Sequence, residues 1–222
     1  MNRLICNKAL RLHLSANLAG FARQPLVRTG LKQAAVAITI VNTQQDPDID
    51  GLYFDNSQTA KGALILTKRA AKMRKHAGQW ALPGGLREKG ESPEKAALRE
   101  LEEEVGLKLG PDHIIGRLDD YNTRSGFTIT PIVVWGGSDR KLTANPAEVA
   151  SIHRIPLTEF MRRDAPILQE NPESENPVLL MPVGNIWIAA PTAALIYQFR
   201  EVAILGREQR VAHYEEPYFA WR

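Results

Sequence analysis

Residues 84–107 read GGLREKGESPEKAALRELEEEVGL. Within this stretch, Ser92 is a good helix N-cap and Pro93 suits the first helical position. Gly106 is placed to end the helix, because glycine readily adopts the left-handed conformation that follows many last turns. The stretch therefore predicts a helix from about Pro93 to Val105.

An acidic face and an apolar stripe run side by side along this predicted helix. With about 100° between successive residues, the apolar stripe consists of Ala97, Leu98, Leu101 and Val105. The adjacent face carries Glu100, Glu103 and Glu104 near the helix C-terminus, where the helix dipole disfavours negative charge. Like charges one turn apart cost roughly a few tenths of a kcal/mol more, so stability alone does not favour this arrangement. A solvated acidic face is one interpretation, and a cradle for a hard divalent cation is the other.

The composition is that of an ordinary globular chain: 222 residues, 44% of them hydrophobic, with a formal net charge of +3. Cys6 is the only cysteine, which excludes an intrachain disulfide and a thiolate metal cluster. No apolar run is long enough to cross a bilayer, so we expect no membrane partner and a cytoplasmic location. The acid-free, Arg-containing N-terminal segment leaves a mitochondrial presequence open as the alternative. A docked first helix is the simpler interpretation, since one helical stripe contains Leu10, Leu14, Leu18 and Phe21.

Three apolar runs are typical of buried strands: residues 34–41 (AAVAITIV), 62–67 (GALILT) and 127–135 (FTITPIVVW). Two further helices are predicted near residues 157–163 and 191–204. Strands interleaved with a few helices predict a mixed α/β or α+β domain. We expect a single domain over residues 1–222, with an N-terminal helical extension at 1–30 and a C-terminal helical region at 188–222.

The stretch 85–107 resembles the signature of the Nudix hydrolase family, G-x5-E-x7-R-E-U-x-E-E-x-G-U, where U is aliphatic. Its fixed positions are matched by Gly85, Glu91, Arg99, Glu100, Leu101, Glu103, Glu104, Gly106 and Leu107. The resemblance implies the Nudix fold, a mixed β-sheet sandwiched between α-helices. It also implies an enzyme that uses Mg²⁺ or Mn²⁺ to hydrolyse a nucleoside diphosphate linked to another moiety.

The same resemblance implies a role for each matched side chain. Glu100, Glu103 and Glu104 are expected to bind the metal, with the Gly85 carbonyl as a further ligand. Arg99 is expected to complete the catalytic set by holding a glutamate in place through charge-assisted hydrogen bonds. Glu91 is expected to belong to the same supporting network.

A second pattern, over residues 65–85, resembles the additional signature of coenzyme A diphosphatases, L-L-T-x-R-[SA]-x3-R-x3-G-x3-F-P-G-G. It implies that Arg69 and Arg74 bind substrate phosphates, whose oxygens guanidinium groups match in paired geometry. The expected reaction cleaves coenzyme A or an acyl-CoA into 4′-phosphopantetheine, or its acyl form, and adenosine 3′,5′-bisphosphate. Leu86 departs from the pattern, since a basic residue is usual there, and IWIAAPTAAL replaces the subgroup's Trp-Gly-x-Thr-Ala pattern.

Other functions stay open at this point. A Nudix diphosphatase could act on ADP-ribose, NADH or dinucleotides, and an RNA-associated or catalytically silent Nudix protein is a further alternative. The small net charge makes us expect a small-molecule nucleotide rather than a nucleic acid as partner. A homodimer is also left open.

Several single residues allow two interpretations each. Glu148 is either an additional acid near the metal or the first acid of a helix. His76 lies in the basic segment and is more typical of a loop residue than of a catalyst. Trp80, Trp135 and Trp187 could stack on a base, although core packing is the commoner role of tryptophan.

Overall fold

The computed structural model of the chain describes residues 4–24, 26, 30–44, 49–53, 60–72, 78–172 and 174–217. Within these residues, an eight-stranded sheet contains β1 (Lys32–Asn42), β2 (Gly62–Arg69), β3 (Trp80–Ala81), β4 (Gly84–Leu86), β5 (Ile114–Arg117), β6 (Tyr121–Asn122), β7 (Phe127–Gly137) and β8 (Val149–Pro156). A second sheet contains β9 (Ile167–Gln169), β10 (Val178–Val183) and β11 (Ile186–Ala189). The helices are α1 (Lys8–Gly20), α2 (Pro93–Val105) and α3 (Thr192–Phe199), with short 3₁₀ turns at Pro111–His113 and Glu159–Met161 and a π-turn at Arg200–Ile204.

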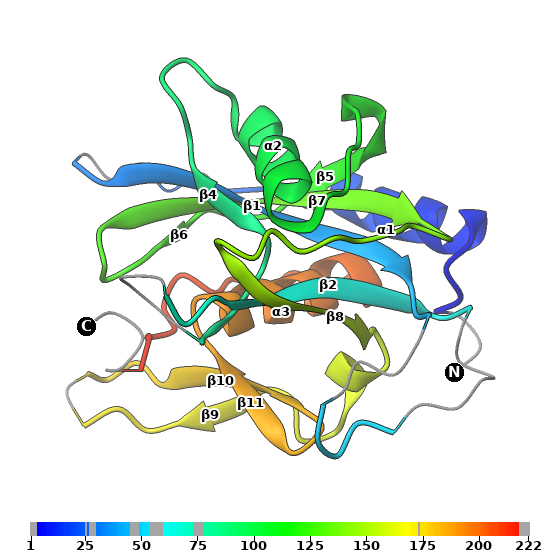
Figure 1. Cartoon of the computed structure of the whole chain (residues 1–222). Helices are drawn as coiled ribbons and strands as arrows, with labels where there is room; N and C mark the ends of the chain where they lie inside the picture. The colour runs from blue at the N-terminus through cyan, green and yellow to red at the C-terminus, as the bar shows by residue number, and fades with distance from the viewer. Residues whose placement is uncertain are drawn as a thin grey trace.

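The large sheet is mixed, as the sequence predicts. Its central path runs β3-β2-β1-β7-β5, and β1 pairs with β7 in parallel. The same strand pairs antiparallel with β2 and with β4, in different parts of its length. Figure 1 shows α2 on one side of this sheet and α3 on the other, between the large sheet and the small one.

Strand β1 is buried on both faces, and its alternating side chains sort into two cores. Ile38 and Ile40 belong to the larger core, which also contains buried residues of α1, α3 and β10. Ala35 and Ala37 belong to a second core under α2. Since an alanine projects only a methyl group, α2 packs closely on the sheet at this point. This close packing brings the acidic face of α2 to β4, where Gly85 lies against Glu100 and Gly84 N donates to Glu104.

Helix α2 spans the residues that its local signals predict. The Ser92 hydroxyl oxygen accepts a hydrogen bond from Lys95 N (3.2 Å), and Gly106 has a left-handed φ of 68°. The Gly106 N–H returns to the carbonyls of Glu102 and Leu101. Both helix ends are therefore specified by neighbouring residues alone.

Helix α1 is docked on the core. Leu10, Leu14 and Leu18 are buried, and Asn17 Nδ2 donates to the carbonyl oxygen of Ala203 (2.9 Å). The docked-helix interpretation of this segment therefore agrees with the structure. Among the described residues, no helix is both long and apolar enough to cross a membrane.

The C-terminal part differs from the helical region expected at 188–222. Ile188 belongs to β11, where it pairs with Met181 of β10. Helical structure covers only residues 192–204 and changes from α to π at Arg200. Gly206, with a φ of 66°, follows the last turn, and the remaining described segment to residue 217 bonds across the structure instead, as Glu215 N does to Pro177 O (3.0 Å). The helix expected near 157–163 is reduced to the 3₁₀ turn Glu159–Met161.

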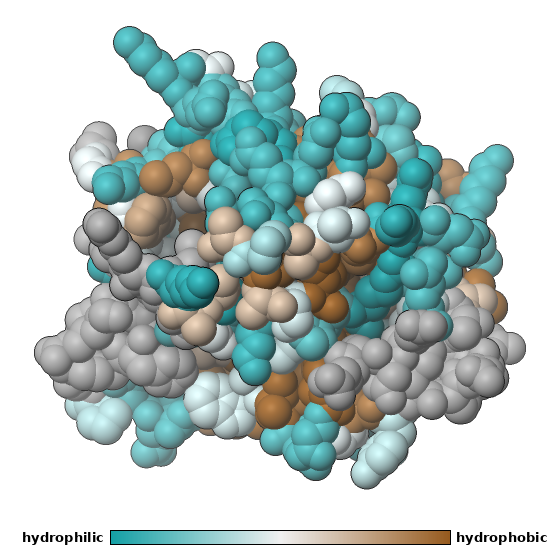
Figure 2. Space-filling view, viewed as in Figure 1, coloured by the Kyte–Doolittle hydropathy of each residue, from teal (hydrophilic) through white to brown (hydrophobic). Residues whose placement is uncertain are grey.

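On the face drawn in Figure 2, hydrophilic residues predominate over the region of α2. Hydrophobic residues come to the surface nearer the middle of the molecule. A polar helix face thus borders an apolar surface region.

We predict that Leu14→Ala lowers the free energy of unfolding by about 2 to 5 kcal/mol, because it removes a fully buried side chain where α1 meets the core. Leu12→Ala on the same helix is the control, since Leu12 is 59% exposed and its truncation should cost less than about 0.5 kcal/mol. Urea unfolding of both variants measures the difference. Equally small effects would contradict the contribution of α1 to the core.

Candidate active site

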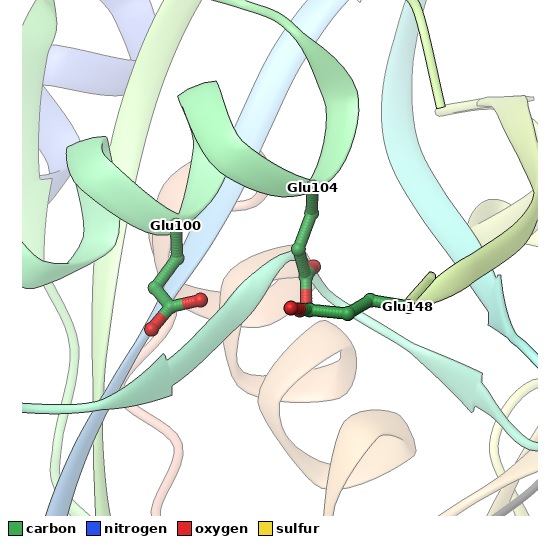
Figure 3. A group of neighbouring side chains, drawn as sticks. All are labelled: Glu100, Glu104 and Glu148. Atoms are coloured by element: carbon green, nitrogen blue, oxygen red, sulfur yellow. The ribbon is translucent and has the colours of Figure 1, made fainter. Parts of the chain in front are cut away.

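Three carboxylates converge beside the large sheet. Glu100 and Glu104 lie one turn apart on α2, and Glu148 lies on the loop that leads into β8. One carboxylate oxygen from each lies within 4.8 Å of the other two. Figure 3 shows Glu148 reaching across to Glu104, with Glu100 one turn earlier on the same helix.

Burial and mutual repulsion make this carboxylate group electrostatically costly. Glu100 is 9% exposed and Glu104 only 4%. Burial and then the charge of Glu100 raise the pKa of Glu104 to about 7. Burial also raises the pKa of Glu100, although Arg99 opposes this change. Such a set of closely spaced carboxylate oxygens fits Mg²⁺ or Mn²⁺, whose charge would offset the repulsion.

Gly85 lets the Glu100 carboxylate lie directly against the backbone. The antiparallel pairing of β4 with β1 sets Gly85 opposite Ala35. A Cβ added at Gly85 would lie 2.3 Å from Glu100 Oε1, far closer than van der Waals contact allows. The neighbouring Gly84 N donates to Glu104 Oε2 (3.3 Å). Gly84 and Gly85 therefore allow the carboxylates of Glu104 and Glu100 to lie against the backbone of β4.

Arg99 connects the acids that surround this group. Its Nε and Nη2 donate to the two oxygens of Glu91 (3.0 and 3.1 Å), which holds the pKa of Glu91 below its usual range. Its Nη1 donates to Glu100 Oε1 (2.8 Å) and to Glu103 Oε2 (2.9 Å). The guanidinium thus fixes the orientation of Glu100 without lying in the carboxylate group itself.

Glu103 lies outside the carboxylate group in this structure. Its side chain is 53% exposed and turned to Arg99. Around a helix, Glu104 is about 40° from Glu100, whereas Glu103 is about 60° away in the other direction. Glu100 and Glu104 face the glycines of β4, and the third acid of the group is Glu148.

Glu148 is held by the end of β2. Its carbonyl oxygen accepts from Ala70 N (2.8 Å), and its own N–H donates to Asn145 O (3.1 Å). It therefore lies in a turn before β8 and not at the start of a helix. Arg69 pairs with Val149 where β2 meets β8, so Glu148 directly precedes the residue opposite Arg69.

A cavity of about 380 Å³ adjoins the carboxylate group and includes Gly84, Gly85 and Arg69 in its wall. Among the described residues, the buried Arg69 Nε has no hydrogen-bond partner. The positive charge of Arg69 acts to lower the pKa of Glu104, which indicates that the two groups lie near each other. Arg74 and His76 lie outside the described residues.

The model of the NUDIX domain matches residues 47–175, more than half of the chain. The chain belongs to the Nudix family. Its mixed sheet flanked by helices is the Nudix fold that the signature implies.

Nudix relatives match the chain over part of their length. The protein named Uncharacterized Nudix hydrolase NudL from Photorhabdus laumondii is 44% identical over 102 residues, which are 46% of this chain and 54% of that protein. The protein of the same name from Yersinia enterocolitica is 42% identical over 100 residues, 45% of this chain and 51% of that protein. The matched part thus spans about half the length of these curated relatives.

Two solved Nudix structures are similar to this chain. The NUDIX domain of Shewanella oneidensis NrtR, complexed with ADP ribose, has a TM-score of 0.49 and 21% identity, covering 84% of this chain and 96% of that one. The MutT/nudix family protein from Enterococcus faecalis has a TM-score of 0.48 and 15% identity, covering 82% of this chain and 63% of that one.

Several wall residues of the cavity lie outside the Nudix signature. Trp187 and Trp80 line it, whereas Trp135 is buried in the core. Phe127 and Glu216 also line the cavity, and the sequence analysis did not single them out. They come from distant parts of the chain, so no local pattern could have connected them.

We predict that the metal-free protein becomes less stable as pH rises from about 5 to 8. Glu104 has a folded-state pKa of about 7, above its ordinary value of 4.5. The folded state therefore binds more protons than the unfolded state between these values, and that stabilisation is lost as pH rises through 7. Glu104→Gln in EDTA should raise the free energy of unfolding at pH 8 by about 1 to 3 kcal/mol and change it little at pH 5.

Glu102→Gln is the matched control for this experiment. Glu102 lies on the same helix, but its exposed side chain pairs with Lys108 (2.8 Å). Its substitution should change stability by less than about 0.5 kcal/mol at both pH values. Urea unfolding measured from pH 5 to 8 would contradict the assignment if both variants behaved alike.

Proposed function

We propose that this chain is a metal-dependent diphosphatase that hydrolyses a nucleoside diphosphate derivative, with coenzyme A or an acyl-CoA as its preferred substrate. The observation that carries the proposal is the buried pair Glu100 and Glu104, faced by Glu148 at the edge of a cavity that includes Arg69. Buried acids without enough positive charge beside them are costly to stability, so a functional role accounts for them better than structure does.

In this proposal, Glu100, Glu104 and Glu148 hold Mg²⁺ or Mn²⁺. The Gly85 carbonyl and Glu103 remain further candidate ligands from the resemblance. When bound, the ion polarises the phosphate oxygens of the substrate and offsets their charge. Glu91 holds the Arg99 guanidinium, which in turn donates to Glu100. The Glu100 Oε1 atom is thereby positioned before the substrate binds.

Arg69 is proposed to bind a phosphate of the substrate. Arg69 lines the cavity, and its buried Nε is without a partner among the described residues. Backbone bonds hold Arg69 on both sides, because its N–H donates to Gln79 O (3.0 Å) and its carbonyl accepts from Gly78 N (3.1 Å). With its backbone held in this way, Arg69 can offer its guanidinium for paired hydrogen bonds to a diphosphate.

The proposed reaction adds water across the diphosphate of coenzyme A. One P–O bond breaks, and the products are 4′-phosphopantetheine and adenosine 3′,5′-bisphosphate. The second sequence pattern, which contains Arg69, favours coenzyme A over ADP-ribose, NADH and dinucleoside polyphosphates. Each of these compounds, incubated separately with the protein and Mg²⁺ and resolved by chromatography, tests the proposal. A higher kcat/KM for ADP-ribose than for coenzyme A would overturn the coenzyme A assignment and leave the diphosphatase.

We predict that Glu104→Gln removes most turnover with Mg²⁺ while the protein stays folded, because one metal-binding charge is lost at nearly constant side-chain volume. The comparison variant is Glu102→Gln, which should retain activity. Measurements across a range of Mg²⁺ concentrations separate weakened metal binding from loss of chemistry. Near-normal activity of Glu104→Gln at limiting Mg²⁺ would contradict its role.

We predict that Arg69→Ala lowers kcat/KM for coenzyme A by about ten- to a hundredfold, since one charge-assisted phosphate contact contributes roughly 1.5 to 3 kcal/mol. Lys72→Ala is the matched control, because it removes the same charge from an exposed position that does not line the cavity. Unchanged kinetics for Arg69→Ala would exclude its contact with the phosphates. Melting temperatures of both variants check that each remains folded.

A further inference from the structure

A second buried acid lines the cavity, apart from the carboxylate group on α2. Glu216 is only 4% exposed and comes from the C-terminal segment. Burial raises the pKa of Glu216 to about 7, even though Arg124 lies close enough to oppose the change. Burying this acid lowers the stability of the folded state. Glu216 is not part of the proposed metal site, so that site does not account for its burial.

The position of Glu216 is fixed by a network around the turn between β6 and β7. Arg124 N donates to Glu216 Oε1 (2.9 Å), and Arg124 Nε donates to the adjacent Glu215 (2.7 Å). Ser174 Oγ donates to the other oxygen of Glu215 (3.2 Å), and Tyr121 OH donates to the Tyr214 carbonyl (2.8 Å). The Glu216 carboxyl is therefore held in place before any ligand binds.

The hydroxyl groups of the cavity wall already have internal partners. Ser125 Oγ donates to Thr123 Oγ1 (3.0 Å), which also accepts from Phe127 N (3.0 Å). Thr192 Oγ1 donates to Trp80 O (3.4 Å). Within the described part of the chain, the Glu216 carboxyl accepts only the bond from Arg124 N, although a carboxyl can accept several. Glu216 thus retains hydrogen-bonding capacity toward the cavity.

Glu216 and the carboxylate group lie toward opposite ends of the cavity. Along β1, Val36 is opposite Gly84 near the acids of α2, and Lys32 is opposite Phe127 near the Arg124 turn. This stretch of strand spans roughly 13 Å at the usual rise per residue. A ligand with its diphosphate at Arg69 would therefore extend another group toward Glu216.

The wall at this end suits a flat ring. Phe127 lines the cavity at this end, and Trp187, which is 48% exposed, lines another part of the same wall. Aromatic faces stack favourably on nucleobases, with little preference among them. A hydrogen-bonding group held beside an aromatic face can distinguish one nucleobase from another, which stacking alone does not.

We propose that Glu216 is a specificity-determining residue that accepts a hydrogen bond from the exocyclic amino group of an adenine-type base. This inference rests on the proposed function, which assigns the diphosphate of the same ligand to the Arg69 end. The carboxyl, partly protonated near neutral pH, can also donate to the ring nitrogen beside that amino group. The charged and titratable groups that interact with Glu216 are Arg124, Glu215 and Tyr121.

The test measures binding of ADP and of purine riboside 5′-diphosphate, which lacks only the amino group, by calorimetry in EDTA. The wild-type protein should bind ADP about ten- to a hundredfold more tightly. Glu216→Met should abolish this ratio. Glu216→Gln should also lower it, because the amide oxygen stays bonded to Arg124 N and the NH2 group that then faces the base cannot accept a hydrogen bond. Glu208→Gln, which changes an exposed acid of the C-terminal part outside the cavity wall, should retain the ratio.

Equal binding of the two diphosphates by the wild-type protein, or an unchanged ratio in Glu216→Met, would overturn the inference. Binding of neither compound would also overturn it. A separate assay of coenzyme A and ADP-ribose hydrolysis with Mg²⁺ distinguishes the two proposals. Hydrolysis without an ADP preference removes only the role of Glu216, whereas an ADP preference without any hydrolysis removes only the diphosphatase. Melting temperatures identify a variant that fails to fold. If Glu216→Met does so, a lowered ratio in Glu216→Gln beside an unchanged ratio in Glu208→Gln supports the inference, and equal ratios overturn it.

Discussion

The burial of Glu100 and Glu104 on one face of α2 is the constraint on which the rest of this structure depends. Both acids lie near the C-terminus of the helix, where the dipole opposes them, and both have raised pKa values because they are buried. Three sets of neighbouring residues make room for these two acids or bond to them. Alanines on β1 let the helix approach, glycines of β4 leave space for the carboxylates, and Arg99 supplies the nearest charge-assisted bond. Stability is lowered at one point of the fold, where three carboxylates are held close together.

The same constraint explains why the end of β2 matters. Arg69 lies at the last position of this strand, and Ala70 directly after it bonds to the backbone of Glu148. One strand end therefore supplies both a positive charge that acts on Glu104 and the anchor for the third acid. A backbone hydrogen bond thus couples the position of Glu148 to the end of β2.

The parts of this structure that the sequence predicts are those that neighbouring residues determine. The bounds of α2 follow from Ser92, Pro93 and Gly106, and β1, β2 and β7 follow from their apolar runs. The choice between Glu103 and Glu148 as third acid could not be predicted from helix geometry, because it depends on which side of α2 the sheet covers. The π-turn after α3 and the position of Glu216 likewise depend on contacts between residues far apart in the chain.

The wall of the cavity contains residues inside the range that matches the NUDIX domain and residues beyond it. The acids of α2, Glu148 and Arg69 all lie within residues 47–175, the range that matches the NUDIX domain. Much of the opposite wall, including Trp187 and Glu216, lies beyond that range. Membership in the Nudix family therefore bears on the end of the cavity that contains the acids of α2 far more than on the end that contains Glu216. Under the proposed function, a preference between ligands is a difference between their binding free energies, and Glu216 acts on that difference from the C-terminal segment. The C-terminal segment is thus the part of this chain in which substrate preference is to be sought.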